Sequence, residues 1–253
     1  MRIRVFATSQ SAARALAADI ARRLGSNGAL VLGLPTGRTP VPLYEALVAT
    51  YRARRVDFSG ATTFNLDEFV GLAPHDDRSY RAFMQRHLFD HVNLPPRRIN
   101  FLNGVAKHLA RECDRYEQAI ARAGGIDLQI LGLGTNGHIG FNEPAPALVA
   151  KTHRTTLSRA SRRANEALFG RLTAVPHEAL SMGMATILHA RRIVLLATGA
   201  SKARSVERMV HGPLTPHLPA SFLQLHANTE VWLDRAAAGR LKNLHGPSPI
   251  PPS

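Results

Sequence analysis

Apolar residues along the chain fall into six short, largely continuous runs that are separated by polar loops and by longer periodic segments. The runs are IRVFA (3–7), ALVLGL (29–34), ATTFNL (61–66), IDLQILGL (126–133), RIVLLAT (192–198) and TEVWLD (229–234). Apolar runs of this length are typical of strands that are covered on both faces. We therefore expect six buried strands.

Segments with helical periodicity lie between these strands. From Ser9 to Leu24, apolar residues recur every four positions at Leu16, Ile20 and Leu24, with Ser9 placed to cap the first turn and Gly25 to end the helix. Further helices are predicted over 41–52, 79–92, 108–124, 177–190 (begun by Pro176) and 201–210. Strands that alternate with helices predict an α/β fold, with a doubly wound, mainly parallel sheet and helices on both faces.

The chain of 253 residues shows no internal repeat and no linker that would divide it. We expect one domain over 1–241, followed by a proline-rich, disordered tail at 242–253. No run of about eighteen apolar residues is present, and MRIRVFATSQ lacks the apolar core of a secretory signal, so we expect no membrane partner. The single cysteine, Cys113, rules out an intrachain disulfide and fits a cytoplasmic protein.

The formal net charge of +14 raises the question of nucleic acid binding. Only four of the 32 basic residues are lysines, and arginine is enriched together with alanine and proline, as in proteins from GC-rich genomes. The basic residues are scattered and are not interleaved with aromatic side chains. We therefore expect no nucleic acid partner, although the basic surface favours small anionic ligands.

Two loops between a strand and a helix have the composition of an anion site. LPTGRTP (34–40) contains Thr36, Gly37, Arg38 and Thr39 just before a predicted helix. Backbone amides at a helix N-terminus that is opened by a glycine can bind phosphate. TGASKA (198–203) has the same form and places Lys202 where the next helix begins. Either loop alone could be an ordinary turn, and their agreement favours phosphate.

A third loop, NLDEFVGL, places Asp67 and Glu68 directly after a buried strand. One of the two carboxylates could cap a helix. Adjacent side chains at the end of a strand diverge, however, so that one can face a cleft while the other faces protein. A partly desolvated carboxylate at this position suits a general base that removes a proton next to a carbonyl group.

The fourth loop, LGLGTNGHIGFNEP (131–144), follows a predicted strand and formally contains a dinucleotide-binding glycine pattern. Prolines at 144 and 146 interrupt the helix that this motif requires, and no acidic residue lies between Glu143 and Glu166. A metal site is not indicated either, because no second histidine lies at helical spacing. The glycines, among them Gly134 and Gly137, leave a thin backbone that presents His138, and Glu143 can orient the imidazole.

Taken together, these motifs resemble those of the glucosamine-6-phosphate deaminase family. LGLPTGRTP, FNLDEFVGL, SYRAFM, LGLGTNGHIGFNEP, ALSMGMATIL, TGASKA and LPASFLQLH occur in this order between residues 32 and 226. The resemblance covers nearly the whole chain except the proline-rich tail. The related 6-phosphogluconolactonases share the fold and a similar Gly-x-x-Gly-His loop, but FNLDE and HIGFNEP are similar to the deaminase versions.

The resemblance implies an enzyme of amino-sugar catabolism that converts glucosamine 6-phosphate and water to fructose 6-phosphate and ammonia, without cofactor or metal. It implies that His138, oriented by Glu143 and supported by Asn136, opens the sugar ring, and that Asp67 then moves a proton through an enolic intermediate. The residues expected to contact the small-molecule amino-sugar phosphate are Thr36, Gly37, Arg38, Thr39, Glu68, Gly134, Gly137 and Lys202.

The sequence departs from the family pattern at three positions. Many members have aspartate where this chain has Asn136, and members usually have a phosphate-binding arginine where this chain has Ala167. Arg38 replaces a small residue, and we expect it to supply the missing positive charge. The loss at Ala167 also leaves open a preference for galactosamine 6-phosphate, because the related isomerases can lack that arginine.

Two other functions stay as alternatives, a lactonase-like hydrolase and a non-catalytic sugar-phosphate sensor. A sensor that regulates transcription would need a DNA-binding domain, for which the chain has no spare segment. Some family members are hexamers that are activated through basic residues after the catalytic loop, whereas KTHRTTL places His153 and Thr155 at those positions. We therefore expect no allosteric activation, and a monomer or dimer rather than a hexamer.

Overall fold

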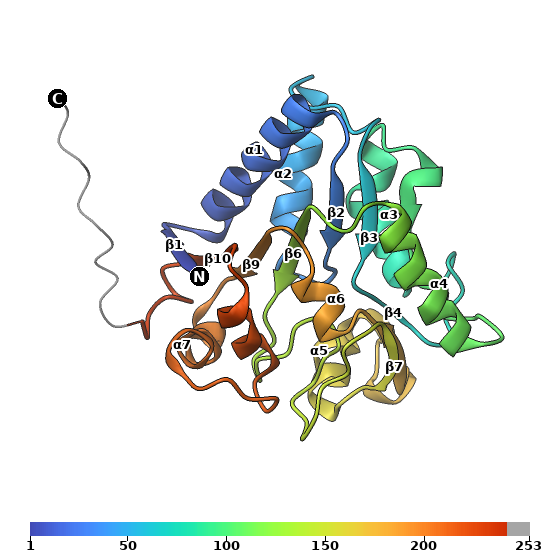
Figure 1. The fold of residues 1–253 in the computed structure, drawn as a ribbon, viewed down its shortest axis with the longest axis vertical. Helices are drawn as coiled ribbons and strands as arrows, with labels where there is room; N and C mark the ends of the chain where they lie inside the picture. The colour runs from blue at the N-terminus through green and yellow to red at the C-terminus, as the bar shows by residue number, and fades with distance from the viewer. Residues whose placement is uncertain (242–253) are drawn as a thin grey trace.

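A computed structural model describes residues 1–241, and the predicted disordered tail at 242–253 lies outside the described residues. Seven parallel strands form the central sheet in the order β1-β10-β9-β6-β2-β3-β5 (Figure 1). Their bounds are β1 Arg2–Phe6, β2 Val31–Leu34, β3 Thr62–Asn65, β5 Ile99–Asn100, β6 Leu128–Gly132, β9 Ile193–Ala197 and β10 Thr229–Asp234. Each of the six predicted strands is present, and the two-residue β5 is added at the edge.

The strand order reverses between β2 and β6. From β2 the chain builds outward to β3 and β5, then returns to place β6 on the other side of β2, followed by β9 and β10. In an open parallel sheet such a reversal opens a crevice at the carboxyl ends of the strands. The loops after β2, β3, β6 and β9 therefore converge on one place.

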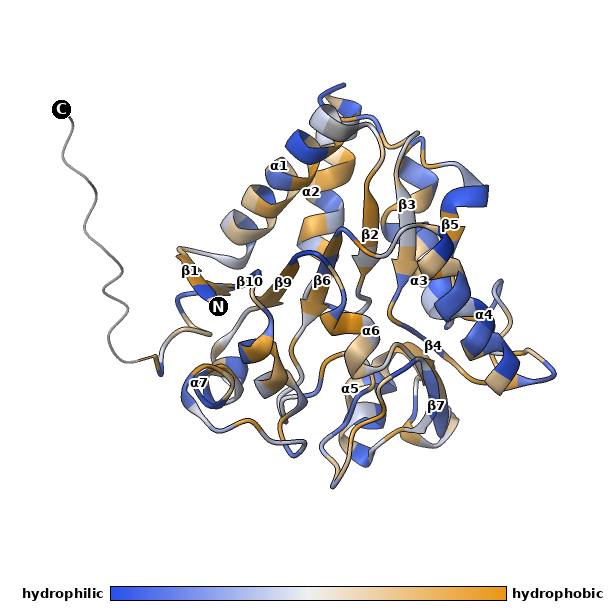
Figure 2. Ribbon diagram, viewed as in Figure 1, coloured by the Kyte–Doolittle hydropathy of each residue, from blue (hydrophilic) through white to orange (hydrophobic). Residues whose placement is uncertain are grey.

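Helices cover both faces of this sheet, and each face has its own apolar core. One core contains buried residues of α1 (Ser9–Asn27), α2 (Val41–Arg52) and α3 (Tyr80–His87). The other contains buried residues of α4 (Leu109–Arg122), α6 (Met184–Leu188) and α7 (Ala203–His211). The apolar strands lie between them in Figure 2, as expected for a sheet that is buried on both faces. The predicted doubly wound α/β fold is confirmed.

The first helix differs in detail from its prediction. Thr8, not Ser9, is the N-cap: its hydroxyl accepts a hydrogen bond from the Ser11 amide, and the Ser11 hydroxyl accepts one from the Thr8 amide. The helix also continues through Gly25 to Asn27. Its packing against α2 outweighs the low helix propensity of one glycine.

No helix of residues 1–241 is both long and apolar enough to cross a membrane.

The helix predicted over 177–190 is wrong. Residues Glu178–Ser181 form strand β8, which pairs antiparallel with β4 (Asp67–Phe69) and β7 (His153–Thr156), and only Met184–Leu188 are α-helical. Gly183 separates the two elements, and a Cβ there would lie 2.2 Å from the Lys151 carbonyl oxygen. The run from Glu178 to Ser181 is a strand because its backbone pairs with β4 and β7, which outweighs the helical spacing of its apolar residues.

Strands β4, β8 and β7 form a second, small sheet. Helix α5 (Arg159–Phe169) was not expected from the sequence, and it packs beside this small sheet, with the rings of Phe169 and Phe69 5.3 Å apart (Figure 1). Short 3-10 turns complete the described chain at Phe89–His91, Pro96–Arg98, Leu172–Ala174, Ala200–Lys202 (η4) and Pro219–Leu225.

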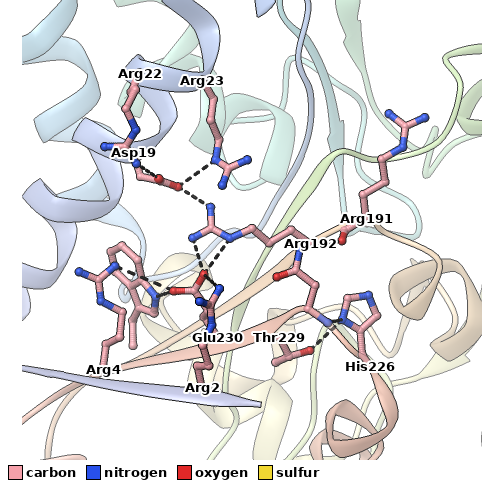
Figure 3. Close-up of polar contacts among 12 residues, drawn as sticks. Arg2, Arg4, Asp19, Arg22, Arg23, Arg191, Arg192, His226, Thr229 and Glu230 are labelled. Carbon is pink, nitrogen blue, oxygen red and sulfur yellow. Dashed lines mark hydrogen bonds and ion pairs between the residues drawn. The ribbon is translucent and has the colours of Figure 1, made fainter. Parts of the chain in front are cut away.

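A buried arginine joins α1 to two strands at the opposite, amino edge of the sheet (Figure 3). The Arg192 guanidinium donates Nη1 to Asp19 of α1, and Nε and Nη2 to Glu230 Oε1 of β10 at 3.0 and 2.7 Å. All three side chains are below 10% exposed, so each buried charge depends on its partners. Glu230 also accepts from the Trp232 indole at 3.0 Å.

We predict that Arg192→Met lowers the free energy of unfolding by about 3–5 kcal/mol, because Asp19 and Glu230 would stay buried without the one buried cation that they share. Urea denaturation would measure this loss. Arg22→Met is the matched control, since Arg22 pairs with the same Asp19 but its side chain is 71% exposed. Removing an exposed partner costs about 1 kcal/mol or less. Equal losses in the two variants would contradict the role given to Arg192.

Candidate functional site

A cavity of about 460 Å³ lies at the carboxyl edge of the sheet, between the loops after β2, β3, β6 and β9, and α5 closes one side. Nine of the residues predicted for the site line this cavity: Thr36, Gly37, Arg38, Thr39, Asp67, Gly134, Asn136, His138 and Lys202. The other three, Glu68, Gly137 and Glu143, do not line it.

Asp67 reaches the cavity because the chain changes sheets directly after β3. Leu66 still bonds to the central sheet, its amide donating to the Leu34 carbonyl, while its own carbonyl accepts from Met182 at the end of the small sheet. Asp67 then begins β4 and is only 6% exposed. Burial and the neighbouring charge of Glu68 raise the pKa of Asp67 to about 8. A hydrogen bond from the Thr36 hydroxyl acts in the opposite direction, because it favours the ionised carboxylate.

Glu68 points the opposite way, as alternation along a strand requires. Its carboxylate accepts three backbone N–H groups, from Phe69 at 2.8 Å and from Tyr80 and Arg81 at 3.0 Å. Burial raises the pKa of Glu68 to about 7, although these hydrogen bonds favour the ionised form. Two of the amides belong to the first turn of α3, so Glu68 anchors that helix. The expectation that Glu68 contacts the substrate does not fit this geometry.

The loop after β6 folds tightly around His138. The Gly134 amide donates to the His138 carbonyl at 2.9 Å, and the Gly137 amide donates back to Gly134 at 3.0 Å. A Cβ on Gly134 would lie 2.4 Å from the imidazole ring, so only glycine leaves room for the ring at this position. Further along, the Asn142 amide donates to the Met182 carbonyl at 2.8 Å and fixes the loop to the end of β8. The imidazole is thus held against the backbone at the cavity wall.

The Glu143 carboxylate lies behind His138. Its Oε2 is 3.6 Å from His138 Nδ1, which is too long for a hydrogen bond but close enough for an ion pair when the imidazole is protonated. The same oxygen accepts from the Asn136 amide at 2.9 Å, and Asn136 Oδ1 accepts from the His138 backbone N–H at 3.2 Å. Asn136 therefore links Glu143 to the loop that carries His138.

Helix α5 supplies the other contacts of Glu143. Oε1 of Glu143 accepts hydrogen bonds from the Ser158 hydroxyl at 3.1 Å and from the Ser161 hydroxyl. Burial opposes ionisation, but His138 and the hydrogen bonds of Ser161 and Asn136 outweigh it and lower the pKa of Glu143 to about 2. Glu143 is therefore ionised at neutral pH, with Nδ1 of His138 facing it and Nε2 left for a ligand.

Two cationic side chains meet at the other wall of the cavity. Arg38 precedes α2, and Lys202 ends η4 and precedes α7. Burial and the charge of Arg38 lower the pKa of Lys202, so the ammonium is partly desolvated beside a like charge. Within residues 1–241, neither side chain forms an ion pair with an acidic group. An anion bound here would relieve this repulsion.

Four side chains at the site were not identified from the sequence: Tyr80, Ser158, Ser161 and Asn165. The Tyr80 hydroxyl donates to Asn165 Oδ1 at 2.9 Å, and both residues line the cavity. Ser158 caps α5 and accepts from the Ser161 amide at 3.1 Å. A Ser-x-x-Ser pattern before a helical segment is a capping signal that would have located this helix and its two hydroxyls.

The arrangement suits proton transfer on an anionic ligand. A buried carboxyl of raised pKa and an imidazole beside an ionised carboxylate face one cavity, whose other wall carries two cations. Among the described residues, no group of three or more His, Cys, Asp and Glu side chains is arranged to hold a metal ion.

We predict that Thr36→Val raises the pKa of Asp67 further above its value of about 8, because the hydroxyl that favours the ionised form is lost. Titration of the aspartate carboxyl carbons by ¹³C NMR would follow this change. Thr36→Ser keeps the hydroxyl and should leave the pKa near that of the unaltered protein. A Thr36→Val variant with an unchanged Asp67 titration would show that the hydroxyl does not act on this carboxyl.

Solved structures similar to this chain share its fold. A structure described as a monomeric glucosamine-6-phosphate deaminase matches with a TM-score of 0.92 and 39% identity, covering 95% of this chain and 100% of the other. A 6-phosphogluconolactonase from Trypanosoma cruzi matches with a TM-score of 0.73, covering 97% of each chain. Its identity of 21% supports the shared fold alone.

Sequence relatives and a family model agree with this likeness. A glucosamine-6-phosphate deaminase of Oceanobacillus iheyensis is 44% identical over 215 residues, which are 85% of this chain and 86% of the relative. One of Clostridium botulinum is 42% identical over 241 residues, 95% of this chain and 99% of the relative. The model of the glucosamine-6-phosphate isomerases/6-phosphogluconolactonase family matches residues 6–232. The chain therefore belongs to this family of sugar-phosphate enzymes.

Proposed function

We propose that this protein is a glucosamine-6-phosphate deaminase, which converts glucosamine 6-phosphate and water to fructose 6-phosphate and ammonia. The observation that carries the proposal is the single cavity onto which Asp67, His138, Arg38 and Lys202 all open. Relatives that are 42–45% identical over most of the chain bear the same name and support this assignment.

Ring opening is the step that we assign to His138. The imidazole takes the proton of the anomeric hydroxyl and returns a proton to the ring oxygen, so that the hemiacetal bond breaks and an aldehyde forms. The ionised Glu143, 3.6 Å from Nδ1, stabilises the imidazolium that exists between these two transfers. Asn136 carries no charge and acts here by holding Glu143 and the His138 backbone together.

Isomerisation and deamination are assigned to Asp67. The ionised carboxylate removes the proton from the carbon that bears nitrogen, while the aldehyde oxygen takes a proton from the substrate ammonium, which gives an enolic intermediate. The carboxyl then delivers its proton to the former aldehyde carbon, which leaves an iminium at the carbon that bears nitrogen. Water then adds to the resulting iminium carbon and ammonia leaves, so no redox cofactor is needed for the balance. The raised pKa of Asp67, about 8, makes this carboxylate a stronger base than an ordinary one. A substrate ammonium beside Asp67 favours the ionised form.

The phosphate of the substrate is assigned to the loop Thr36–Thr39 together with Lys202 and Arg38. Ala167 is exposed and does not line the cavity, although it lies on α5 one turn beyond the lining residue Ala164. Arg38 reaches the same cavity from the loop after β2 and supplies a second cation beside Lys202. Binding energy at this end positions the reacting carbons at the other end.

We extend the proposal to the setting of the enzyme. A single catalytic domain over 1–241, acting in the cytoplasm as a monomer or dimer without allosteric activation, fits the single cysteine and the stretch KTHRTTL. The similar solved structure described as monomeric supports the lower oligomeric states. Size-exclusion chromatography with light scattering tests this part, and a hexamer would contradict it.

The assay that tests the proposal is ammonia release from glucosamine 6-phosphate, with galactosamine 6-phosphate and unphosphorylated glucosamine run in parallel. We expect rapid release from glucosamine 6-phosphate alone, and loss of that activity in Asp67→Asn and His138→Gln. Release mainly from galactosamine 6-phosphate would move the assignment to the other epimer. No release from any of the three would overturn the deaminase assignment.

We predict that Arg38→Ser raises the KM for glucosamine 6-phosphate about tenfold and leaves kcat nearly unchanged, because the lost contact lies at the phosphate and contributes about 1.4 kcal/mol. Steady-state kinetics would measure both constants. Arg97→Ser removes an exposed arginine outside the cavity and should leave KM as it is. An unchanged KM in Arg38→Ser would end the idea that Arg38 replaces the arginine missing at Ala167.

A further inference from the structure

Ser161 lies between the cavity and the Glu143 carboxylate. It belongs to the first turn of α5, lines the cavity and is only 2% exposed. Its hydroxyl donates to Glu143 Oε1, while its backbone N–H is already used by the Ser158 cap at 3.1 Å. The helix cap uses the backbone N–H of Ser161 and not its hydroxyl, so the hydroxyl is available to donate its hydrogen bond to the Glu143 carboxylate.

The two oxygens of Glu143 have separate partners. Oε1 accepts the hydroxyls of Ser158 and Ser161 from α5, whereas Oε2 accepts the Asn136 amide and faces His138 Nδ1. A carboxylate held at both oxygens cannot rotate about its terminal bond without breaking a contact. The α5 hydroxyls thereby keep Oε2 directed at the imidazole.

The position of Ser161 is itself fixed from the Asp67 side of the cavity. Asn165, one helical turn later, donates to the Ser161 carbonyl at 2.9 Å and accepts from the Tyr80 hydroxyl at 2.9 Å. The Tyr80 ring stacks on Phe141, with centroids 5.9 Å apart, and its backbone N–H is bound by Glu68. Helix α5 is therefore bonded both to Glu143 and, through Asn165, to Tyr80 at the start of α3.

We propose that Ser161 is a positioning residue, which acts through Glu143 to keep His138 oriented for ring opening. This inference rests on the proposed deaminase function. Ser161 itself transfers no proton to the substrate. It stabilises the ionised, correctly rotated form of Glu143, which in turn stabilises the imidazolium.

The test compares Ser161→Ala with Ser161→Thr, which keeps the hydroxyl, and with Arg163→Ala, which alters an exposed position of the same helix. We expect Ser161→Ala to lower kcat about 10- to 100-fold with less than about a twofold change in KM, the size of a lost hydrogen bond to a charged group. Ser161→Thr should recover most of kcat, and Arg163→Ala should match the unaltered enzyme.

A second readout does not depend on the reaction. Loss of the Ser161 hydroxyl should raise the pKa of Glu143 above about 2, because one group that favours the ionised form is gone. Carboxyl ¹³C NMR of the substrate-free protein measures this directly. As the pH is lowered, kcat of Ser161→Ala should begin to fall at a higher pH than kcat of the unaltered enzyme, because Glu143 of the variant is protonated at a higher pH. Ser161→Cys serves in place of alanine if that variant does not fold.

Three outcomes separate this inference from the proposed function. A lower kcat together with a raised Glu143 pKa supports the positioning role. A lower kcat with an unchanged Glu143 titration, or an unchanged kcat, overturns it. If the unaltered enzyme releases no ammonia from any amino-sugar phosphate, the proposed function fails. The contact between Ser161 and Glu143 is then tested by NMR alone, and a Glu143 pKa that is the same in Ser161→Ala and in the unaltered protein would overturn it.

Discussion

The carboxylate of Glu143 is the point at which the separate parts of the site meet. It receives Asn136 from its own loop and Ser158 and Ser161 from α5, and it faces His138. A buried carboxylate is stable in its charged form only when such partners surround it. Because these partners come from two different elements, the charge of Glu143 fixes where α5 lies against the loop. The arrangement of the imidazole depends on this one satisfied charge.

Asp67 presents the opposite case, although its neighbour Glu68 is the same kind of group. The strand geometry directs the two carboxyls to opposite faces, where Glu68 is bound by three amides and Asp67 has an Oδ1 without a hydrogen-bond partner among residues 1–241. Both have raised pKa values, but only Asp67 opens onto the cavity. A buried oxygen left without a partner costs stability, and at a cavity wall it is the atom that a ligand can use.

The sequence predicted the part of the fold that depends on local pattern. Apolar runs located all six main strands, and the loops after them contained Asp67, His138 and Lys202. What it did not predict depends on contacts between distant segments. Residues 178–181 form a strand because they pair with β4 and β7, and α5 is polar enough to read as a loop. Ser161 enters the site only through α5, so apolar periodicity could not identify it.

The two ends of strand β9 show how the fold separates stability from binding. Arg192, directly before the strand, is buried between Asp19 and Glu230, and its charge is fully compensated (Figure 3). Lys202, in the loop after the strand, is partly buried beside Arg38 and forms no ion pair within the described chain. A compensated charge at the amino edge fixes α1 to the sheet and attracts no ligand. Uncompensated cations at the carboxyl edge destabilise the empty site slightly, and it is this imbalance that a phosphate dianion can satisfy.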